Sequence, residues 1–153
     1  MLNYNWKTYA LALALAYLGS SAVMADGGNG GGGRSSKLAP FQELIDAEKY
    51  QQAISELDKA LRDDPDNPDL LNLIAFSHRK LERFEIALNY YRQALQADPG
   101  HRGANEYLGE LYLRLGQLDK AEERLAVLDK KCFFGCREYD KLEKAIEDYR
   151  KAH

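Results

Sequence analysis

Cys132 and Cys136 are the two side chains of this 153-residue chain whose type and spacing are best suited to chemistry. They could form a disulfide, because Gly135 permits the tight turn that brings residues four apart to bridging distance. They could instead hold copper(I), for which two soft thiolates are suitable ligands, although no histidine can be assigned as a third ligand. Redox catalysis is disfavoured, since it more typically uses Cys-x-x-Cys on a scaffold that contains strands. We expect the disulfide, with no metal or other cofactor.

The remaining groups that could do chemistry form no recognisable site. His78, His101 and His153 are scattered, and no two of them have the spacing that would place a shared metal on one helix face. We expect His78 in the core and His101 in a solvated turn. Many carboxylates stand beside basic residues at helical spacing, as Glu56 does with Lys59, which is typical of solvated pairs. The sequence contains no nucleophile elbow, zinc signature or phosphate loop, so it predicts that the protein is not an enzyme.

Charge and the N-terminal segment restrict the partners and the location. The net charge is -3, and acidic and basic residues are mixed along the chain, which argues against a nucleic-acid partner. Residues 1–25 contain Lys7, an apolar stretch over 10–18 and small residues at Val23 and Ala25, which predicts a signal peptide and a periplasmic or secreted protein. An uncleaved membrane helix is the alternative, and membrane contact is expected only in that case. Export favours bridged cysteines.

The elements that position these residues are helices. Residues 26–36 (DGGNGGGGRSS) predict a flexible linker, and the helix formers that prevail after it predict an all-α fold. Asn67-Pro68 is typical of a helix start, and Gly116 of a helix end. The predicted helices cover 40–48, 50–63, 67–80, 83–97, 101–114, 117–130 and 136–151.

The helices belong to a repeat of 34 residues. The aligned positions are Ala53, Ala87 and Ala121; Tyr50, Phe84 and Leu118; and Leu57, Tyr91 and Leu125. The small alanines suit points where two antiparallel helices approach most closely, and the bulky residues fill the space between hairpins. Because no hairpin can bury its apolar face alone, we expect the hairpins to stack on one another.

This pattern resembles the tetratricopeptide repeat family. The middle unit carries the family signature, with only His78 departing from it, at Leu71, Ile74, Ala75, His78, Ala87, Tyr91, Ala94 and Pro99. The first unit has a short first helix with Pro40 inside the expected span, and the third unit lacks the closing proline. The resemblance covers units at about 37–66, 67–100 and 101–131.

The resemblance implies a right-handed α-solenoid of three hairpins, and residues 132–153 would complete it. They comprise the Cys-x3-Cys turn and a helix whose single apolar stripe consists of Tyr139, Leu142, Ile146 and Tyr149. Such a helix suits the cap that keeps the open end of a solenoid soluble.

In this family the first helix of each hairpin lines a concave groove that receives peptides or helices of partner proteins. The resemblance places Asp69, Asn72, Phe76, Arg79, Gly103, Glu106, Glu110 and Leu113 in that groove. Phe76 would be a binding anchor or would pack under the N-terminal hairpin, and both alternatives are open. Arg79 could pair with a partner carboxylate, whereas Glu106 and Glu110 would favour a basic segment.

Some members grip the C-terminal carboxylate of chaperones with a lysine-asparagine clamp. The corresponding positions here are Leu73, Gly103 and Tyr107, which argues against that ligand. The resemblance therefore implies a non-catalytic scaffold or assembly factor that binds another protein or a peptide. The predicted signal peptide adds the expectation that the protein and its partner belong to the cell envelope. A copper-handling accessory protein that uses the cysteine pair is the alternative. An apolar face that forms a homodimer is a third.

Overall fold

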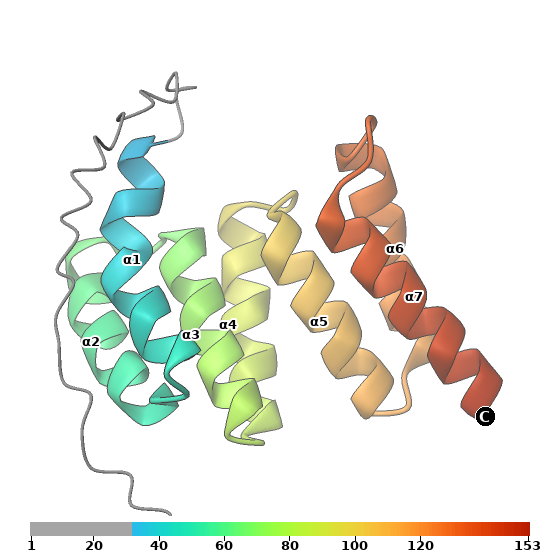
Figure 1. Ribbon diagram of the computed structural model, residues 1–153, viewed down its shortest axis with the longest axis horizontal. Helices are drawn as coiled ribbons and strands as arrows, with labels where there is room; N and C mark the ends of the chain where they lie inside the picture. Colours follow the sequence, from blue (N-terminus) through green and yellow to red (C-terminus); the bar gives the residue numbers. More distant parts are fainter. Residues whose placement is uncertain (1–31) are drawn as a thin grey trace, which may run out of the picture.

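Seven α-helices form the part of the chain that the structure, a computed structural model, describes, residues 32–153 (Figure 1). The helices are α1 (Gly32–Asp46), α2 (Tyr50–Asp63), α3 (Pro68–Lys80), α4 (Phe84–Ala97), α5 (Arg102–Arg114), α6 (Leu118–Lys131) and α7 (Arg137–Ala152). No strand occurs among these residues, so the all-α prediction is confirmed. The predicted signal peptide and residues 26–31 of the predicted linker lie outside the described residues.

Helix α1 is longer than the sequence pattern predicted. It begins at Gly32, within the predicted linker, and continues through Pro40, which was expected to shorten it. Proline removes one backbone hydrogen bond from a helix interior. Packing compensates on both sides of Pro40, because Leu38 and Phe41 lie against the apolar cluster that α1 shares with α2 and α3. The packing of α1 on its neighbours therefore outweighs the tendency of Pro40 to interrupt the helix.

The helix ends repeat with the same 34-residue period. Asn67 caps α3 by accepting hydrogen bonds from the backbone N–H groups of Asp69 and Leu70, and Pro68 follows it at the first helical position. Glu48, Glu82 and Gly116 all have positive φ, at 57°, 57° and 71°. These three residues occupy equivalent positions just after α1, α3 and α5. The repeat is therefore visible in the backbone as well as in the side chains.

The predicted repeat positions form the core. Ala53, Ala87 and Ala121 are completely buried where the helices of a hairpin approach, and Tyr91 is a large, fully buried side chain. The buried residues form two clusters, one around α1–α3 and one around α3–α7. Leu61 and Tyr90 pack against both clusters, so the interior is continuous along the row. This is the stacking that the repeat predicted.

Helix α7 covers the end of the row, as predicted for a capping helix. It packs against both α5 and α6, and its Leu142 and Ile146 are buried. The approach to α5 is close at Gly109, where an added Cβ would lie 2.5 Å from Leu142 Cδ2. Glycine at this point of the repeat therefore makes room for the cap.

The contacts between helices define an inner side of the row. The first helices of successive hairpins touch one another, α1 with α3, α3 with α5, and α5 with α7. The backbones of the second helices α2, α4 and α6 do not approach one another as closely. The row therefore curves with its first helices on the inside, as in a solenoid. Within residues 32–153, no helix has the length and apolar character needed to span a bilayer.

Candidate partner-binding face

The inner side of α3 and α5 carries a compact group of polar and aromatic side chains. We call this surface the inner face and define it by Phe76, Arg79, Tyr107 and Glu110. Residues at spacings of three and four share one side of a helix, so Phe76 and Arg79 come from one turn of α3, and Tyr107 and Glu110 from one turn of α5. Direct contact between α3 and α5 brings the two pairs together.

Arg79 is the centre of the inner face. Its Nη1 donates a hydrogen bond to Glu110 Oε2 over 2.8 Å, and the two side chains form an ion pair. Its guanidinium carbon lies 5.2 Å from the Phe76 ring centroid and 5.3 Å from that of Tyr107. The two ring centroids are 4.9 Å apart. Both rings are close enough for cation–π attraction, so Arg79 is held in place by three neighbours.

Arg79 and Glu110 were expected to offer charges to a partner, and the structure instead pairs them with each other. Only 12% of the Arg79 side chain is exposed, whereas 28% of Glu110 remains accessible. A guanidinium that is already paired and flanked by rings has little surface left for a partner carboxylate. The inner face therefore presents two partly accessible aromatic rings and an ion pair whose charges neutralise each other.

Glu106 is buried, which corrects its predicted role as an exposed attraction for basic segments. Its residue is 1% exposed, and its carboxylate lies 3.2 Å from Lys141 Nζ of the capping helix. Burial raises the pKa of Glu106, and the hydrogen bond and charge of Lys141 oppose this rise. Sequence reasoning placed Glu106 on the groove because it did not anticipate how closely α7 covers α5.

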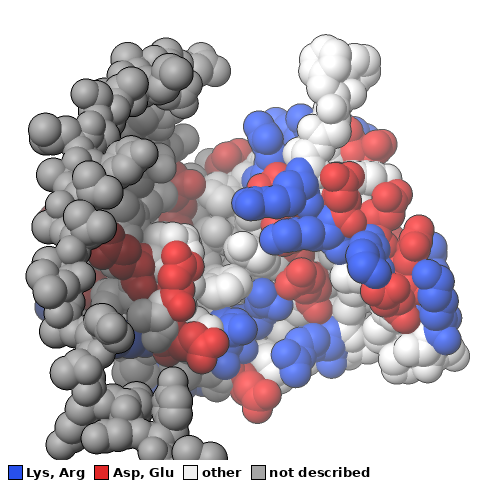
Figure 2. Space-filling view, viewed as in Figure 1, with Lys and Arg blue, Asp and Glu red and all other residues white. Residues whose placement is uncertain are grey.

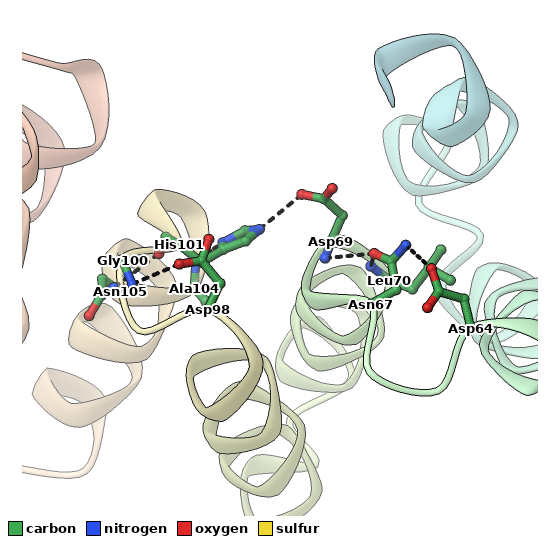
Figure 3. Close-up of polar contacts among 9 residues, drawn as sticks. All are labelled: Asp64, Asn67, Asp69, Leu70, Asp98, Gly100, His101, Ala104 and Asn105. Atoms are coloured by element: carbon green, nitrogen blue, oxygen red, sulfur yellow. Dashed lines mark hydrogen bonds and ion pairs between the residues drawn. The ribbon is translucent and has the colours of Figure 1, made fainter. Parts of the chain in front are cut away.

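The polar contacts at the start of α3 and α5 connect two successive repeats (Figure 3). His101 occupies the position equivalent to Asn67 and caps α5, because its Nδ1 accepts a hydrogen bond from the Ala104 backbone N–H. Its Nε2 lies 3.0 Å from Asp69 Oδ1 on α3. In neutral histidine, acceptance at Nδ1 requires the proton on Nε2, which then donates to Asp69.

His101 was predicted to be solvated, and that prediction is wrong. Its side chain is largely enclosed because the stacking of α5 on α3 brings the turn before α5 against the first turn of α3. Asp69, predicted for the groove, accordingly takes part in the junction between two repeats. Their contact joins the first turns of α3 and α5, the two helices that carry the inner face.

The other predicted groove residues differ in accessibility. Asn72 and Leu113 are buried, so they offer little surface to a partner. Phe76 is partly buried and packs with the N-terminal apolar cluster, which agrees with the packing alternative and leaves part of its ring accessible. Tyr107 was named only as a position corresponding to the carboxylate clamp and was not among the predicted groove residues. It lies four residues after Gly103 and three before Glu110, so helical spacing could have identified it.

The cysteine pair forms a short cross-link outside the inner face. The sulfur atoms of Cys132 and Cys136 are bonded, with Cα atoms 5.5 Å apart, which agrees with the predicted disulfide. His78 is buried as expected and stacks on Tyr90, with ring centroids 5.8 Å apart. Burial lowers the pKa of His78, and the charge of Arg83 lowers it further. Within the described residues, no three His, Cys, Asp or Glu side chains gather into a group that could hold a metal.

The fold and the inner face together define a helical-repeat scaffold, a curved stack of two-helix units with a surface on its inner side. Two family models, each described as tetratricopeptide repeat, match residues 38–76 and 78–132. The chain belongs to the tetratricopeptide repeat family.

Solved structures of this family resemble the chain closely in fold. The Sgt2 TPR domain from Aspergillus fumigatus aligns with a TM-score of 0.67 and 21% identity, over 78% of this chain and 79% of that one. A tetratricopeptide repeat protein from Parabacteroides merdae gives a TM-score of 0.63 and 23% identity, over 73% and 43% of the two chains. The first TPR of Spaghetti (RPAP3), bound to the HSP90 peptide SRMEEVD, gives 0.63 and 20%, over 73% and 89%. At these identities the likeness establishes the fold alone.

Relatives found by sequence are much longer proteins. The TPR repeat-containing thioredoxin TTL4 of Arabidopsis thaliana is 32% identical over 51% of this chain and 11% of its own length. The DnaJ protein P58IPK homolog B of Oryza sativa subsp. japonica is 28% identical over 76% of this chain and 22% of its own length. The chain thus spans between about a tenth and a fifth of these relatives.

Proposed function

We propose that this protein is a non-catalytic scaffold or assembly factor of the cell envelope that binds a peptide or helix of another protein on its inner face. The observation that carries the proposal is the cluster of Phe76, Arg79, Tyr107 and Glu110, in which two partly accessible aromatic rings flank a fixed guanidinium. Aromatic and arginine side chains are the residue types that most often dominate protein interfaces. Two solved TPR domains that resemble this chain in fold are bound to peptides of HSP90 and HSP70, which is consistent with this use of the fold.

The proposal differs from chaperone-tail recognition in the chemistry of its ligand. The positions that resemble the carboxylate clamp hold Leu73, Gly103 and Tyr107, none of which carries a positive charge. Arg79 is paired with Glu110, and Glu106 with Lys141. We therefore propose a ligand that offers apolar or aromatic side chains to the rings, with little net charge. The envelope location rests on the signal-like residues 1–25, so the proposed partner is an envelope protein in the periplasm or outside the cell.

The test uses two matched arginine substitutions. Arg79→Gln alters the inner face, and Arg92→Gln alters an exposed arginine of α4, a helix on the outer side of the row. Each variant, together with wild type and Phe76→Ala, is immobilised and exposed to envelope extract after circular dichroism has verified its helix content. We expect Arg79→Gln and Phe76→Ala to lose a partner that wild type and Arg92→Gln both retain. Equal recovery of every partner by all four proteins would refute the inner face as the binding site.

Copper handling by Cys132 and Cys136 is the alternative function, and the bonded sulfur atoms argue against it because a disulfide offers no thiolate ligand. Counting reactive thiols on unreduced protein distinguishes the two. A protein with no reactive thiol supports the structural role, whereas two thiols that take up copper(I) support copper handling. Sedimentation over a concentration series tests the homodimer alternative in the same sample.

A further inference from the structure

Phe133 and Phe134 are exposed to solvent to a degree unusual for phenylalanine. They are 86% and 98% exposed, and the third exposed large apolar residue in the described chain, Ile86, reaches only 43%. Both lie in the five-residue segment 132–136, which we call the Phe loop. This segment projects from the molecule between α6 and α7 as an uncharged lobe (Figures 1 and 2).

Neither phenylalanine contributes to the folded core. Both are absent from the two apolar clusters, and their mutual contact is a T-shaped pair with centroids 5.1 Å apart. The Cys132–Cys136 disulfide closes the base of the loop and holds the two rings at its tip. A loop fixed in this way loses little conformational freedom when its tip is covered, which favours binding. The loop belongs to the connection between α6 and α7, whereas the residues of the inner face belong to α3 and α5.

Basic residues flank the aromatic tip on both sides. Lys130 and Lys131 precede the loop, Arg137 follows it, and all three are exposed. The nearest acidic residues, Asp129 and Glu138, stand one position further from the loop on each side. Asp129 is exposed, whereas the Glu138 side chain is 19% exposed and its ion-pair partner Arg137 is 78% exposed. Residues 129–138 therefore expose three basic side chains but one acidic side chain. In Figure 2, Lys and Arg side chains lie at the base of the lobe.

We propose that the Phe loop is a membrane-docking element that inserts Phe133 and Phe134 into the surface of an anionic bilayer. Aromatic side chains are favourable at the boundary between headgroups and acyl chains, and cations beside them are attracted to anionic lipid. A protruding tip with two perpendicular rings suits a fluid lipid layer, which adapts to their arrangement, better than a protein pocket, which would have to match it. Docking would orient the inner face with respect to the membrane.

The test places a fluorescent reporter at the tip of the full-length chain. Phe134→Trp is introduced together with Trp6→Phe, which removes the single native tryptophan. On vesicles of phosphatidylcholine with phosphatidylglycerol we expect a blue shift of the tryptophan emission and quenching by brominated lipid. Ile86→Trp in the same background is the matched control on α4 and should show neither change. This local signal distinguishes the loop from binding by any other part of the chain.

Two further substitutions test the two parts of the proposed contact. Phe133→Ser with Phe134→Ser should lower partitioning to the anionic vesicles by about a hundredfold, whereas Ile86→Ser leaves it unchanged. Replacing Lys130 and Lys131 by Gln should weaken binding by roughly fivefold for each cation at low salt, only on anionic vesicles.

Three outcomes would overturn the proposal. The first is an unshifted emission of the Phe134→Trp protein on every vesicle, and the second is an equal shift at position 86. The third is a blue shift already present without vesicles, because it would mean that protein, in the same or a second chain, covers the tip.

Discussion

Glu106 and Arg79 illustrate how single charged residues of this protein are used. Both occupy positions that face the inside of the solenoid, and both are paired within the chain, Glu106 with Lys141 and Arg79 with Glu110. Each pair joins helices of neighbouring units. The charges therefore hold successive repeats in register, and the aromatic rings beside Arg79 remain as the part of the face that a partner can reach.

The raised pKa of Glu106 predicts a particular pH dependence of stability. Because the folded state binds this proton more tightly than the unfolded state, stability falls as the pH rises from the unfolded value near 4.5 through the folded pKa. Glu106→Gln removes this contribution. We expect the free energy of unfolding of wild type, measured in urea, to decline relative to the variant across that pH range.

Lys141→Gln should change the pH dependence in the direction opposite to Glu106→Gln and serves as a control. Lys141 lowers the pKa of Glu106, so its removal should widen the pH range over which stability is lost. Superimposable pH profiles of wild type and Glu106→Gln would show that the carboxyl is not perturbed by folding.

At the scale of the elements, the turns within the three hairpins share one backbone conformation, although different residues adopt it. The equivalent residues with positive φ are Glu48, Glu82 and Gly116. Glycine adopts this conformation without a steric penalty, whereas a residue with a Cβ is strained there. Two of the three turns thus accept a local cost, because the packing of α1 on α2 and of α3 on α4 determines the turn.

Glu82→Gly should therefore stabilise the protein. The steric cost of the left-handed conformation, which glycine avoids, is larger than the extra entropic cost of ordering glycine on folding. We therefore expect a gain of about 0.5–1 kcal/mol in the free energy of unfolding. Gly116→Ala, at the equivalent turn, should destabilise by a similar amount. Urea denaturation measures both, and a loss of stability in Glu82→Gly would contradict the interpretation of these turns.

At the scale of the whole molecule, the two apolar clusters and the cap form one interior. Leu61 and Tyr90 join the clusters, and α7 covers α5 and α6 through Leu142 and Ile146. In a stack of repeats each unit is stabilised mainly by its neighbours, so the open end is protected only by its cap.

Leu142→Ala should weaken the C-terminal end first. The side chain is completely buried against Gly109, so its truncation is expected to cost about 2–5 kcal/mol. Amide hydrogen exchange should become faster in α5, α6 and α7 before it does in α2 and α3. The exposed-site variant Ile86→Ala is expected to change exchange little. A uniform increase over all helices would show that the stack unfolds as a single unit.

The sequence by itself determined the helices, their repeat and the place of the cap. The signals for these features are local or periodic: the amphipathic pattern, the helix start at Asn67-Pro68 and the recurring alanines. Stacking then follows, because such hairpins bury their apolar faces against one another. The sequence also predicted the disulfide between Cys132 and Cys136, because the two residues are only four apart and the turn between them contains a glycine. Buried His78 followed from its place in the repeat.

Only the tertiary structure decided which side chains meet across units. Arg79 and Glu110 are 31 residues apart, and Asp69 and His101 are 32 apart, so their contacts depend on how closely one hairpin lies on the next. The passage of α1 through Pro40 and the burial of Glu106 under α7 have the same origin. The exposure of Phe133 and Phe134 could not be predicted from the sequence either. Phenylalanine is usually buried, and only the packing of the helices shows that no other element covers these two side chains.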